Sequence, residues 1–397
     1  MKIGIYGGTF DPIHRGHLSA AEAAAQVLGL DQVLLVPDAL PPHKELSSGS
    51  ASGQQRYEMA ELALYEARCP ARVLDTELRR GGVSYTCDTL RQLKEQYPRD
   101  ELWLLMGSDM FLSLHTWRQS EVITSLAGIA AFSRQQEDES LAFRRQKEYL
   151  ETAYGAKVVT MVNPNLIEVS SSWLRQTLRQ GGGEKFLPTP VYGYIQRTGL
   201  YGVRRDLKNL SPDELRPIAL SYLKVKRMPH VLGTEREAVF LAEKYGADVE
   251  KARVAALLHD CTKKLDMQQQ LALCGQYGIR LDELEQKSLK LLHSKTGAAI
   301  ARDVFGVPGD VYNAIYYHTT GKPDMTLLEK VIYLADYIEP TRNFPGVERL
   351  RQAVHEDLDR GLCLALRDGV EELESMGNPV HHNTLEALSY MQTEMGG

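Results

Sequence analysis

The amino-acid sequence predicts a protein of two domains, an α/β domain built on a parallel sheet and an all-α domain. A chain of 397 residues is too long for one typical hydrophobic core. In the first half, short apolar runs alternate with segments of helical periodicity, whereas nearly every segment after residue 204 has helical periodicity. We therefore expect one domain at 1–203 and a second at 204–397.

The first half contains the short, continuously apolar runs typical of buried parallel strands. Helical segments separate them, as in sheets that are covered by helices on both faces. The expected strands are 2–6, 31–37, 72–74, 101–106, 128–132 and 157–162. The expected helices are 16–28, 54–68, 88–96 and one that begins at 171–172.

A strong helix start opens the second half. Ser211 as N-cap, Pro212 at the first helical position and Glu214 at the third form a capping arrangement. Segments with alternating β-branched residues are scarce after it, so we expect helices throughout. These are 213–226, 235–245, 249–258, 267–277, 296–304, 310–317, 327–338 and 348–366.

Composition narrows the class of protein. With 43% hydrophobic and 25% charged residues the chain has the make-up of ordinary globular proteins, and its net charge of −6 argues against a broad nucleic-acid-binding surface. The five cysteines are scattered without a C-x-x-C pair, which favours a reducing compartment. No apolar run approaches membrane-spanning length, and residues 1–6 lead into the first motif without a signal segment. We expect a cytoplasmic protein with no nucleic-acid or membrane partner.

A glycine-rich turn joins the first expected strand to the first helix. The turn consists of Gly7, Gly8, Thr9 and Phe10. His14 and His17 follow it three residues apart, so both imidazoles lie on one face of the helix start and can donate hydrogen bonds to phosphates. The string is neither G-x-G-x-x-G nor a Walker motif. A single histidine here would more often cap or pack, but the combination indicates a nucleotide site.

This string resembles the nucleotidylyltransferase superfamily, in which an H-x-G-H element binds the phosphates of ATP. Further strings resemble bacterial nicotinate-nucleotide adenylyltransferases and cover about 1–201 in order. They are P-P-H-K ending at Lys44, S-Y-T-C-D-T-L around Thr86, G-S-D ending at Asp109, L-H-T-W-R around Trp117 and V-S-S-S-W-L-R ending at Arg175. In the last string Val169 and Ser172 replace the family's usual Ile and Thr, and a hydroxyl is kept.

The resemblance implies a Rossmann-like fold and transfer of AMP from ATP to nicotinate mononucleotide, giving deamido-NAD and pyrophosphate in NAD biosynthesis. The 5′-phosphate attacks the α-phosphorus in line, so the protein positions substrates and neutralises charge, with Mg²⁺ sharing this task. It implies that His14, His17 and Arg175 are catalytic. The implied binding residues are Gly7, Gly8, Thr9, Phe10, Lys44, Thr86, Gly107, Asp109, Trp117, Ser171 and Ser172.

Some of these assignments rest on resemblance alone. A lone tryptophan is more often core than ligand, so only the family likeness favours Trp117 as a stacking platform and Thr86 as a polar contact. Lys44 could equally be a solvated cation. Pantetheine-phosphate and cytidylyl transferases share H-x-G-H and remain alternatives for this half.

The second half carries a set of histidines and aspartates suited to a metal. Imidazole and carboxylate ligands suit first-row transition metals, and six ligands are enough for two ions. As separate features they would be caps or core hydrogen-bonders, but the adjacent His259-Asp260 pair and its surroundings favour a metal site. The six candidates are His230, His259, Asp260, His293, His318 and Asp336. His355, His381 and His382 lack such context, and we expect them at the surface.

The pattern H…HD…D resembles the HD phosphohydrolase superfamily. The strings at 226–231, 318–321 and 334–340 resemble bacterial symmetrical diadenosine tetraphosphate hydrolases, over about 215–390. The resemblance implies cleavage to two ADP at a centre of two transition metals, with iron expected. It makes Asp260 and Lys263 catalytic and Arg342 a phosphate contact, against the alternative that both cations are merely exposed.

The sequence therefore predicts a fused bifunctional enzyme whose partners are ATP, nicotinate mononucleotide and diadenosine tetraphosphate. The alternative is that the HD half is a non-catalytic nucleotide- and metal-sensing module or hydrolyses another nucleotide. Oligomeric state (a homo-oligomer included), metal identity and the preference for nicotinate over nicotinamide are left open.

Overall fold

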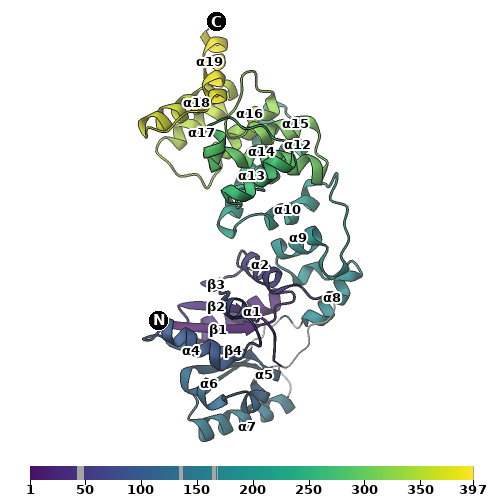
Figure 1. The fold of residues 1–397 in the computed structure, drawn as a ribbon, viewed down its shortest axis with the longest axis vertical. Coiled ribbons are helices and arrows are strands. Elements are labelled where there is room, and N and C mark those ends of the chain that lie inside the picture. Colours follow the sequence, from purple (N-terminus) through teal and green to yellow (C-terminus); the bar gives the residue numbers. More distant parts are fainter. Residues whose placement is uncertain (43–48, 134–136, 163–166, 168, 397) are drawn as a thin grey trace. The chain divides into compact units, whose positions relative to one another are not determined.

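The computed structural model describes residues 1–42, 49–133, 137–162, 167 and 169–396, and they form two compact units (Figure 1). The first unit comprises residues Met1–Arg204 and the second Arg205–Gly397, so the division falls one residue after the expected boundary. Independent folding of the two halves stays a prediction.

A six-stranded parallel sheet forms the centre of the first unit, as predicted. Its strand order is β3-β2-β1-β4-β5-β6, and the order reverses between β1 and β4. In sheets of this order, ligands bind in the crevice beyond the carboxyl ends of the two strands at the reversal. The strands are β1 (Lys2–Gly8), β2 (Gln32–Pro37), β3 (Ala71–Val73), β4 (Glu101–Gly107), β5 (Gly128–Ser133) and β6 (Val158–Val162).

The sheet is apolar on both faces because its side chains pack beneath helices. Ile5 pairs in register with Leu34 of β2 and Leu104 of β4, and all three are buried. The helices are α1 (Arg15–Leu28), α2 (Gly53–Ala63), α3 (Thr76–Arg80), α4 (Thr86–Gln96), α5 (Ser108–Ser113), α6 (Ser120–Leu126), α7 (Glu137–Tyr154), α8 (Ser171–Arg179) and α9 (Thr189–Thr198). Short 3₁₀ turns lie at η1 (Leu114–Thr116), η2 (Glu184–Phe186) and η3 (Leu200–Gly202).

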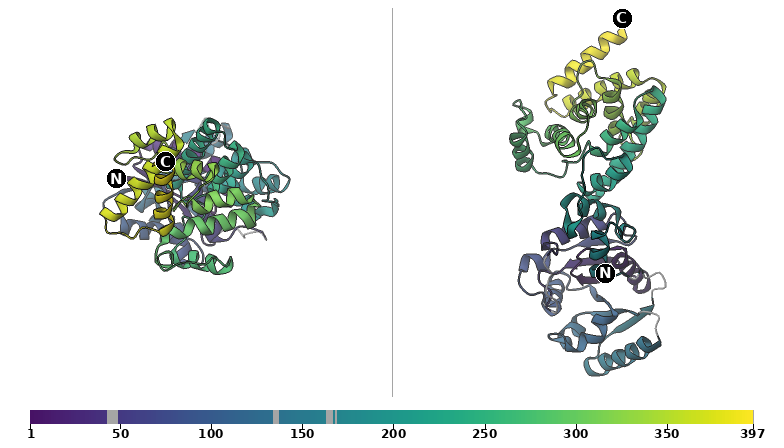
Figure 2. Two further views of the ribbon diagram at one scale, coloured as in Figure 1. Left: turned by 90° about the horizontal axis from the view of Figure 1, so that it is seen from above. Right: turned by 90° about the vertical axis from the view of Figure 1, so that its right-hand side faces the viewer.

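All regular secondary-structure elements among the described residues of the second unit are helices, which confirms the predicted class (Figure 2). Helix α11 packs on α12 and α16, and α15 packs on α14 and α16. The helices are α10 (Pro212–Ser221), α11 (Met228–Tyr245), α12 (Val249–Leu258), α13 (Met267–Gln276), α14 (Leu289–Phe305), α15 (Gly309–Tyr317), α16 (Leu327–Ile338), α17 (Val347–Glu356), α18 (Leu358–Ser375) and α19 (His382–Gly396), with 3₁₀ turns η4 (Val225–Arg227) and η5 (Glu285–Lys287).

The helices differ from the expected ones in two places, and the first concerns the candidate metal ligands. Helices α11 and α14 begin about seven residues earlier than periodicity predicts, and this places His230 and His293 on helices. The expected single helix at 348–366 is wrong, because Asp357 is extended (φ −152°) and its carboxylate accepts a hydrogen bond from the backbone N–H of Arg360. The chain therefore stops α17 and starts α18 at that residue.

Among the described residues, none of the helices combines the length and apolar character needed to cross a lipid bilayer.

Candidate functional sites

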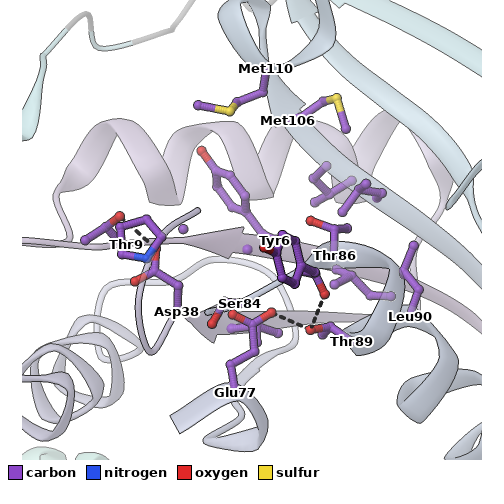
Figure 3. Close-up of a pocket in the computed structure, with 18 of the residues that line it drawn as sticks. Tyr6, Thr9, Asp38, Glu77, Ser84, Thr86, Thr89, Leu90, Met106 and Met110 are labelled. Atoms are coloured by element: carbon purple, nitrogen blue, oxygen red, sulfur yellow. Dashed lines mark hydrogen bonds between the residues drawn. The ribbon is translucent and has the colours of Figure 1, made fainter. Parts of the chain in front are cut away.

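A cavity of about 480 Å³ opens beyond the carboxyl ends of β1 and β4, where the strand order reverses. In Figure 3, Tyr6 lies between a polar side, with Asp38, Glu77 and Thr89, and an apolar side with two methionines. Eight of the expected site residues line it. They are Gly7, Gly8, Thr9, Phe10, His17, Thr86, Gly107 and Trp117.

The glycine turn is shaped by an aromatic ring. Phe10 has φ 51°, a left-handed conformation uncommon for residues other than glycine, and its ring folds back beneath Gly8. A Cβ on Gly8 would lie 3.2 Å from that ring, so a side chain there would force the ring to shift. Glycine at this position therefore lets the turn pass directly over the ring.

His14 and His17 act as a stacked pair at the start of α1. Their ring centroids are 3.7 Å apart, and the backbone N–H of His14 donates to Nδ1 of His17 over 3.2 Å. Because Nδ1 of His17 accepts, its proton is assigned to Nε2, which makes the residue a neutral donor at the cavity wall. Gly16 permits this packing, since a Cβ there would lie 2.7 Å from the carbonyl oxygen of Ile167.

Burial keeps both imidazoles neutral at pH 7. It lowers the pKa of His14 to about 4. Burial, with the neighbouring His14 as a second cause, lowers the pKa of His17 well below its ordinary value. The pair therefore offers hydrogen bonds rather than positive charge to a phosphate.

Buried polar side chains fix the loop that follows the glycine turn. Arg56 is fully buried and donates to the carbonyl oxygen of Thr9 (2.7 Å) and to Oδ1 of Asp38 (3.0 Å). The Tyr201 hydroxyl donates to Oδ1 of Asp11 over 2.8 Å. The sequence interpretation did not identify Arg56 or Tyr201, because their partners are distant in the chain.

Five of the expected residues lie outside the walls of the cavity. Arg175 donates to the carbonyl oxygen of Asp11 (2.6 Å), and the Ser171 hydroxyl donates to that of Pro12 (3.2 Å). In this structure these two residues hold the loop. The other three are His14, the exposed Asp109 and the exposed Ser172. Lys44 falls outside the described residues.

Several residues that line the cavity were not predicted as site residues from the sequence. Burial raises the pKa of Glu77, which accepts a 2.5 Å hydrogen bond from the Thr89 hydroxyl. Arg118 stacks over the ring of Tyr85, with 4.5 Å between the guanidinium carbon and the ring centroid. Arg118 stood in one of the family-like strings, so that string was the available signal.

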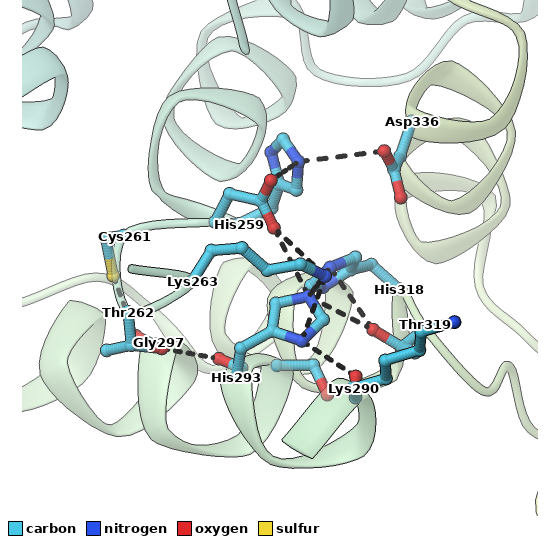
Figure 4. A network of polar contacts seen from close by, with 12 residues as sticks. His259, Cys261, Thr262, Lys263, Lys290, His293, Gly297, His318, Thr319 and Asp336 are labelled. Atoms are coloured by element: carbon cyan, nitrogen blue, oxygen red, sulfur yellow. Dashed lines mark hydrogen bonds and ion pairs between the residues drawn. The ribbon is translucent and has the colours of Figure 1, made fainter. Parts of the chain in front are cut away.

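In the second unit, all six expected metal ligands converge. Figure 4 labels four of them, His259, His293, His318 and Asp336. Nε2 of His230 lies 3.0 Å from Oδ1 of Asp336 and 3.4 Å from Nε2 of His259. On the other side, Nε2 of His293 lies 3.1 Å from Nε2 of His318 and 3.2 Å from Oδ1 of Asp260. The ligands come from α11, α14 and α16 and from the residues that follow α12 and α15.

The four imidazoles are oriented through their Nδ1 atoms. In three of them Nδ1 contacts the backbone carbonyl oxygen three residues earlier, at 2.7 Å for His259, 2.8 Å for His293 and 2.6 Å for His318. In His230, Nδ1 contacts Oε1 of the buried Glu339 over 3.0 Å. These partners are acceptors only, so each Nδ1 carries the proton and each Nε2 presents a lone pair to the centre.

This donor set fits metal ions. Two pairs of Nε2 lone pairs face one another, and Oδ1 of Asp260 is buried without a hydrogen-bond partner among the described residues. Such an arrangement costs free energy unless a cation lies between the atoms. The ligands form overlapping groups, and Asp260 belongs both to one with His230 and His259 and to one with His293 and His318. That overlap suits a carboxylate that bridges two ions.

Three cations surround the aspartates. Arg342 donates to Oδ1 of Asp336 (2.6 Å), and Nζ of Lys263 lies 3.0 Å from Nε2 of His293. Arg227 forms an ion pair with Asp260 and was missed, although it stands in the string that precedes His230. Burial opposes ionisation of Asp260, yet the neighbouring histidines hold its pKa well below the ordinary value.

The expected surface exposure is wrong for His381 and only partly right for His355. His381 is 4% exposed, and its Nδ1 accepts from the backbone N–H of Asn383 while Nε2 donates to Glu285 over 3.0 Å. The expectation of exposure was wrong because these partners are formed only in the tertiary fold. His355 contacts Glu237 over 2.7 Å and is only partly exposed, whereas His382 is exposed.

Comparisons with known proteins divide the chain in the same way. Residues 5–177 match the family model for cytidylyltransferase-like proteins, and residues 227–341 match that for the HD domain. The probable nicotinate-nucleotide adenylyltransferase of Neisseria meningitidis is 38% identical over 200 residues, which are 50% of this chain and 98% of the relative. That of Dictyoglomus thermophilum is 39% identical over 202 residues, covering 51% of this chain and 100% of the relative.

Among solved structures, a predicted HD superfamily hydrolase involved in NAD metabolism from Clostridium acetobutylicum is 42% identical. The match covers 47% of this chain and 98% of that protein, with a TM-score of 0.45.

Proposed function

Because its N-terminal half belongs to the nicotinate-nucleotide adenylyltransferase family and its C-terminal half contains an HD domain, we propose that this chain is a fused, bifunctional enzyme. The N-terminal half transfers AMP from ATP to nicotinate mononucleotide and releases pyrophosphate. The C-terminal half hydrolyses diadenosine tetraphosphate to two molecules of ADP. Both reactions act on phosphoanhydrides of adenosine.

The cavity at the strand reversal is the observation that carries the first activity. A phosphate oxygen of the mononucleotide attacks the α-phosphorus of ATP, and the bond to the pyrophosphate oxygen breaks. The Nε2–H of His17 at the cavity wall offers a hydrogen bond to the phosphates. Trp117 offers a flat apolar face for the pyridine ring, and Mg²⁺ enters with ATP.

Product analysis of the full-length chain tests this activity. With ATP and nicotinate mononucleotide we expect deamido-NAD and pyrophosphate. Nicotinamide mononucleotide and pantetheine phosphate are tested as competing acceptors, and CTP is tested as a competing nucleotide donor. Faster turnover of any of these than of nicotinate mononucleotide would contradict the nicotinate assignment and favour another nucleotidylyltransferase.

The converging ligand set carries the second activity. Bound transition metals supply Lewis acidity and lower the pKa of a coordinated water. Around them, Arg227, Lys263 and Arg342 are placed to neutralise phosphate oxygens, and the histidines, held through their Nδ1 atoms, keep their Nε2 atoms fixed. By family resemblance the proposed metal is iron, and His and carboxylate ligands would also accept manganese or cobalt.

Incubation of the metal-loaded chain with diadenosine tetraphosphate distinguishes the proposed symmetric hydrolase from another hydrolase class and from a sensing module. Symmetric cleavage gives ADP alone, whereas ATP plus AMP would assign a different hydrolase class. A chain that binds the nucleotide and metal without turnover would instead support the sensing module.

A further inference from the structure

The four metal-binding histidines are not oriented in the same way. His259 and His318 follow the last turns of α12 and α15, where helix carbonyl groups have no helical donors of their own and accept the Nδ1 protons. His230 lies in the first turn of α11, where the helix offers no such carbonyl. Its Nδ1 proton goes to the carboxylate of Glu339 instead.

Glu339 is built into this position. It is fully buried at the end of α16, three residues after Asp336, and its Oε2 accepts from the backbone N–H of Thr341 over 2.7 Å. Gly233 of α11 makes room for it, since a Cβ there would lie only 2.2 Å from Oε2. The packing of α11 on α16 therefore admits this carboxylate because residue 233 has no side chain.

A carboxylate and a carbonyl group affect an imidazole differently. A negatively charged acceptor on Nδ1 makes Nε2 a stronger ligand than a neutral carbonyl does, and loss of such a partner typically weakens metal binding about 10–100-fold. We define the His230 position as His230, His259, Asp260 and the adjacent Asp336. The His293 position is Asp260, His293 and His318.

Charged side chains contact both positions. At the His230 position Arg342 and Arg227 form ion pairs with Asp336 and Asp260, and Glu339 contacts the imidazole of His230 itself. Glu339 adds a buried negative charge beside the His230 position. The ammonium group of Lys263 lies 3.0 Å from Nε2 of His293 and 3.9 Å from Oδ1 of Asp260, so it repels a cation at the His293 position. With the metal centre of the proposed function as the premise, we propose that the two positions are inequivalent and that Glu339 makes the His230 position the tighter one. Glu339 is a positioning residue in this scheme, acting through His230.

The test measures Mn²⁺ binding to metal-stripped, full-length protein, with free Mn²⁺ followed by electron paramagnetic resonance. For the wild-type chain we expect two ions with different Kd values. Glu339→Gln should weaken the tighter Kd about 10–100-fold and leave the weaker one unchanged. Thr341→Val, which keeps the Glu339 carboxylate while removing one hydroxyl donor, is the matched control and should leave the Mn²⁺ count at two with the wild-type order of affinity.

Lys263→Met tests the weaker, His293 position independently. Removal of the ammonium group should strengthen the weaker Kd and bring the two values together, without change in the tighter one. Equal weakening of both Kd values by Glu339→Gln would show a general structural role and overturn the proposal, as would an unchanged tighter Kd. If Glu339→Gln does not fold, a Lys263→Met chain with wild-type Kd values overturns it. A wild-type chain that binds no Mn²⁺ contradicts the metal centre itself, and a chain with two equal Kd values contradicts only the inequivalence.

Discussion

The stacked histidine pair predicts a pH dependence of stability that can be assigned to one residue. The pKa of His14 is about 4 in the folded chain and about 6.5 in an unfolded one. The unfolded chain therefore binds more protons between these values, so this contribution to the unfolding free energy is complete above pH 6.5 and is lost as pH falls toward 4. Between pH 7 and pH 5 the loss from His14 alone is about 2 kcal/mol.

Urea unfolding of the full-length chain, followed by tryptophan fluorescence, measures this change for the first unit separately. All three tryptophans, Trp103, Trp117 and Trp173, lie in the first unit, so their fluorescence reports its unfolding. His14→Asn keeps a polar residue that favours the N-cap position and removes the titration. We expect the wild type to lose about 2 kcal/mol more than His14→Asn between pH 7 and pH 5. Equal losses in the two proteins would refute the assignment of the low pKa to burial of His14.

Further predictions concern the two activities and the buried loop support. His17→Ala should lower adenylyl transfer about a hundredfold or more and leave hydrolysis unchanged, and near-normal transfer by this variant would remove the pair from the mechanism. Asp260→Ala should lose bound metal and hydrolysis but keep adenylyl transfer; metal content at the wild-type level would contradict a bridging role. Arg56→Met leaves the Asp38 carboxylate buried without its guanidinium partner, which should cost the first unit about 3–5 kcal/mol by tryptophan fluorescence, with partial recovery in the double variant with Asp38→Asn. Separate chains that end or begin at residue 204 should each keep one activity, whereas loss of solubility in either would show that the halves depend on each other.

Sequence patterns predicted the secondary-structure elements that depend on residues close together in the chain. The parallel strands follow from continuous apolar runs, and the start of α10 follows from its capping residues. The break between α17 and α18, at the capping residue Asp357, was missed because the helical periodicity of 348–366 runs through that residue. At the break Gly361 approaches the backbone of Val354, where a Cβ would lie 2.6 Å from the Cα atom. That approach depends on how two helices pack, and periodicity does not contain it.

The candidate sites show the same division. Residues that belong to dense motifs, such as His259 and Asp260, could be identified from the sequence. Residues that act through distant partners were not identified, because Arg56 and Tyr201 contact groups that are remote in the chain. Glu339 stands in the family-like string at 334–340, but its contact with His230, 109 residues away, could not be read from that string. Nothing in local spacing distinguished the buried His381 from the exposed His382.

The placement of His259 immediately after α12 fixes the length of that helix. One extra residue within α12 would turn the following side chains by about 100° and advance them about 1.5 Å. His259 and Asp260 would then both leave the centre, while the helix could keep its own hydrogen bonds. Since α12 is also held against α11 and α16, the slip could not be absorbed by sliding the helix without losing packed side chains. Insertions should therefore be tolerated in the connection between the end of α11 and Asp248, the N-cap of α12, and not between Asp248 and the metal ligands.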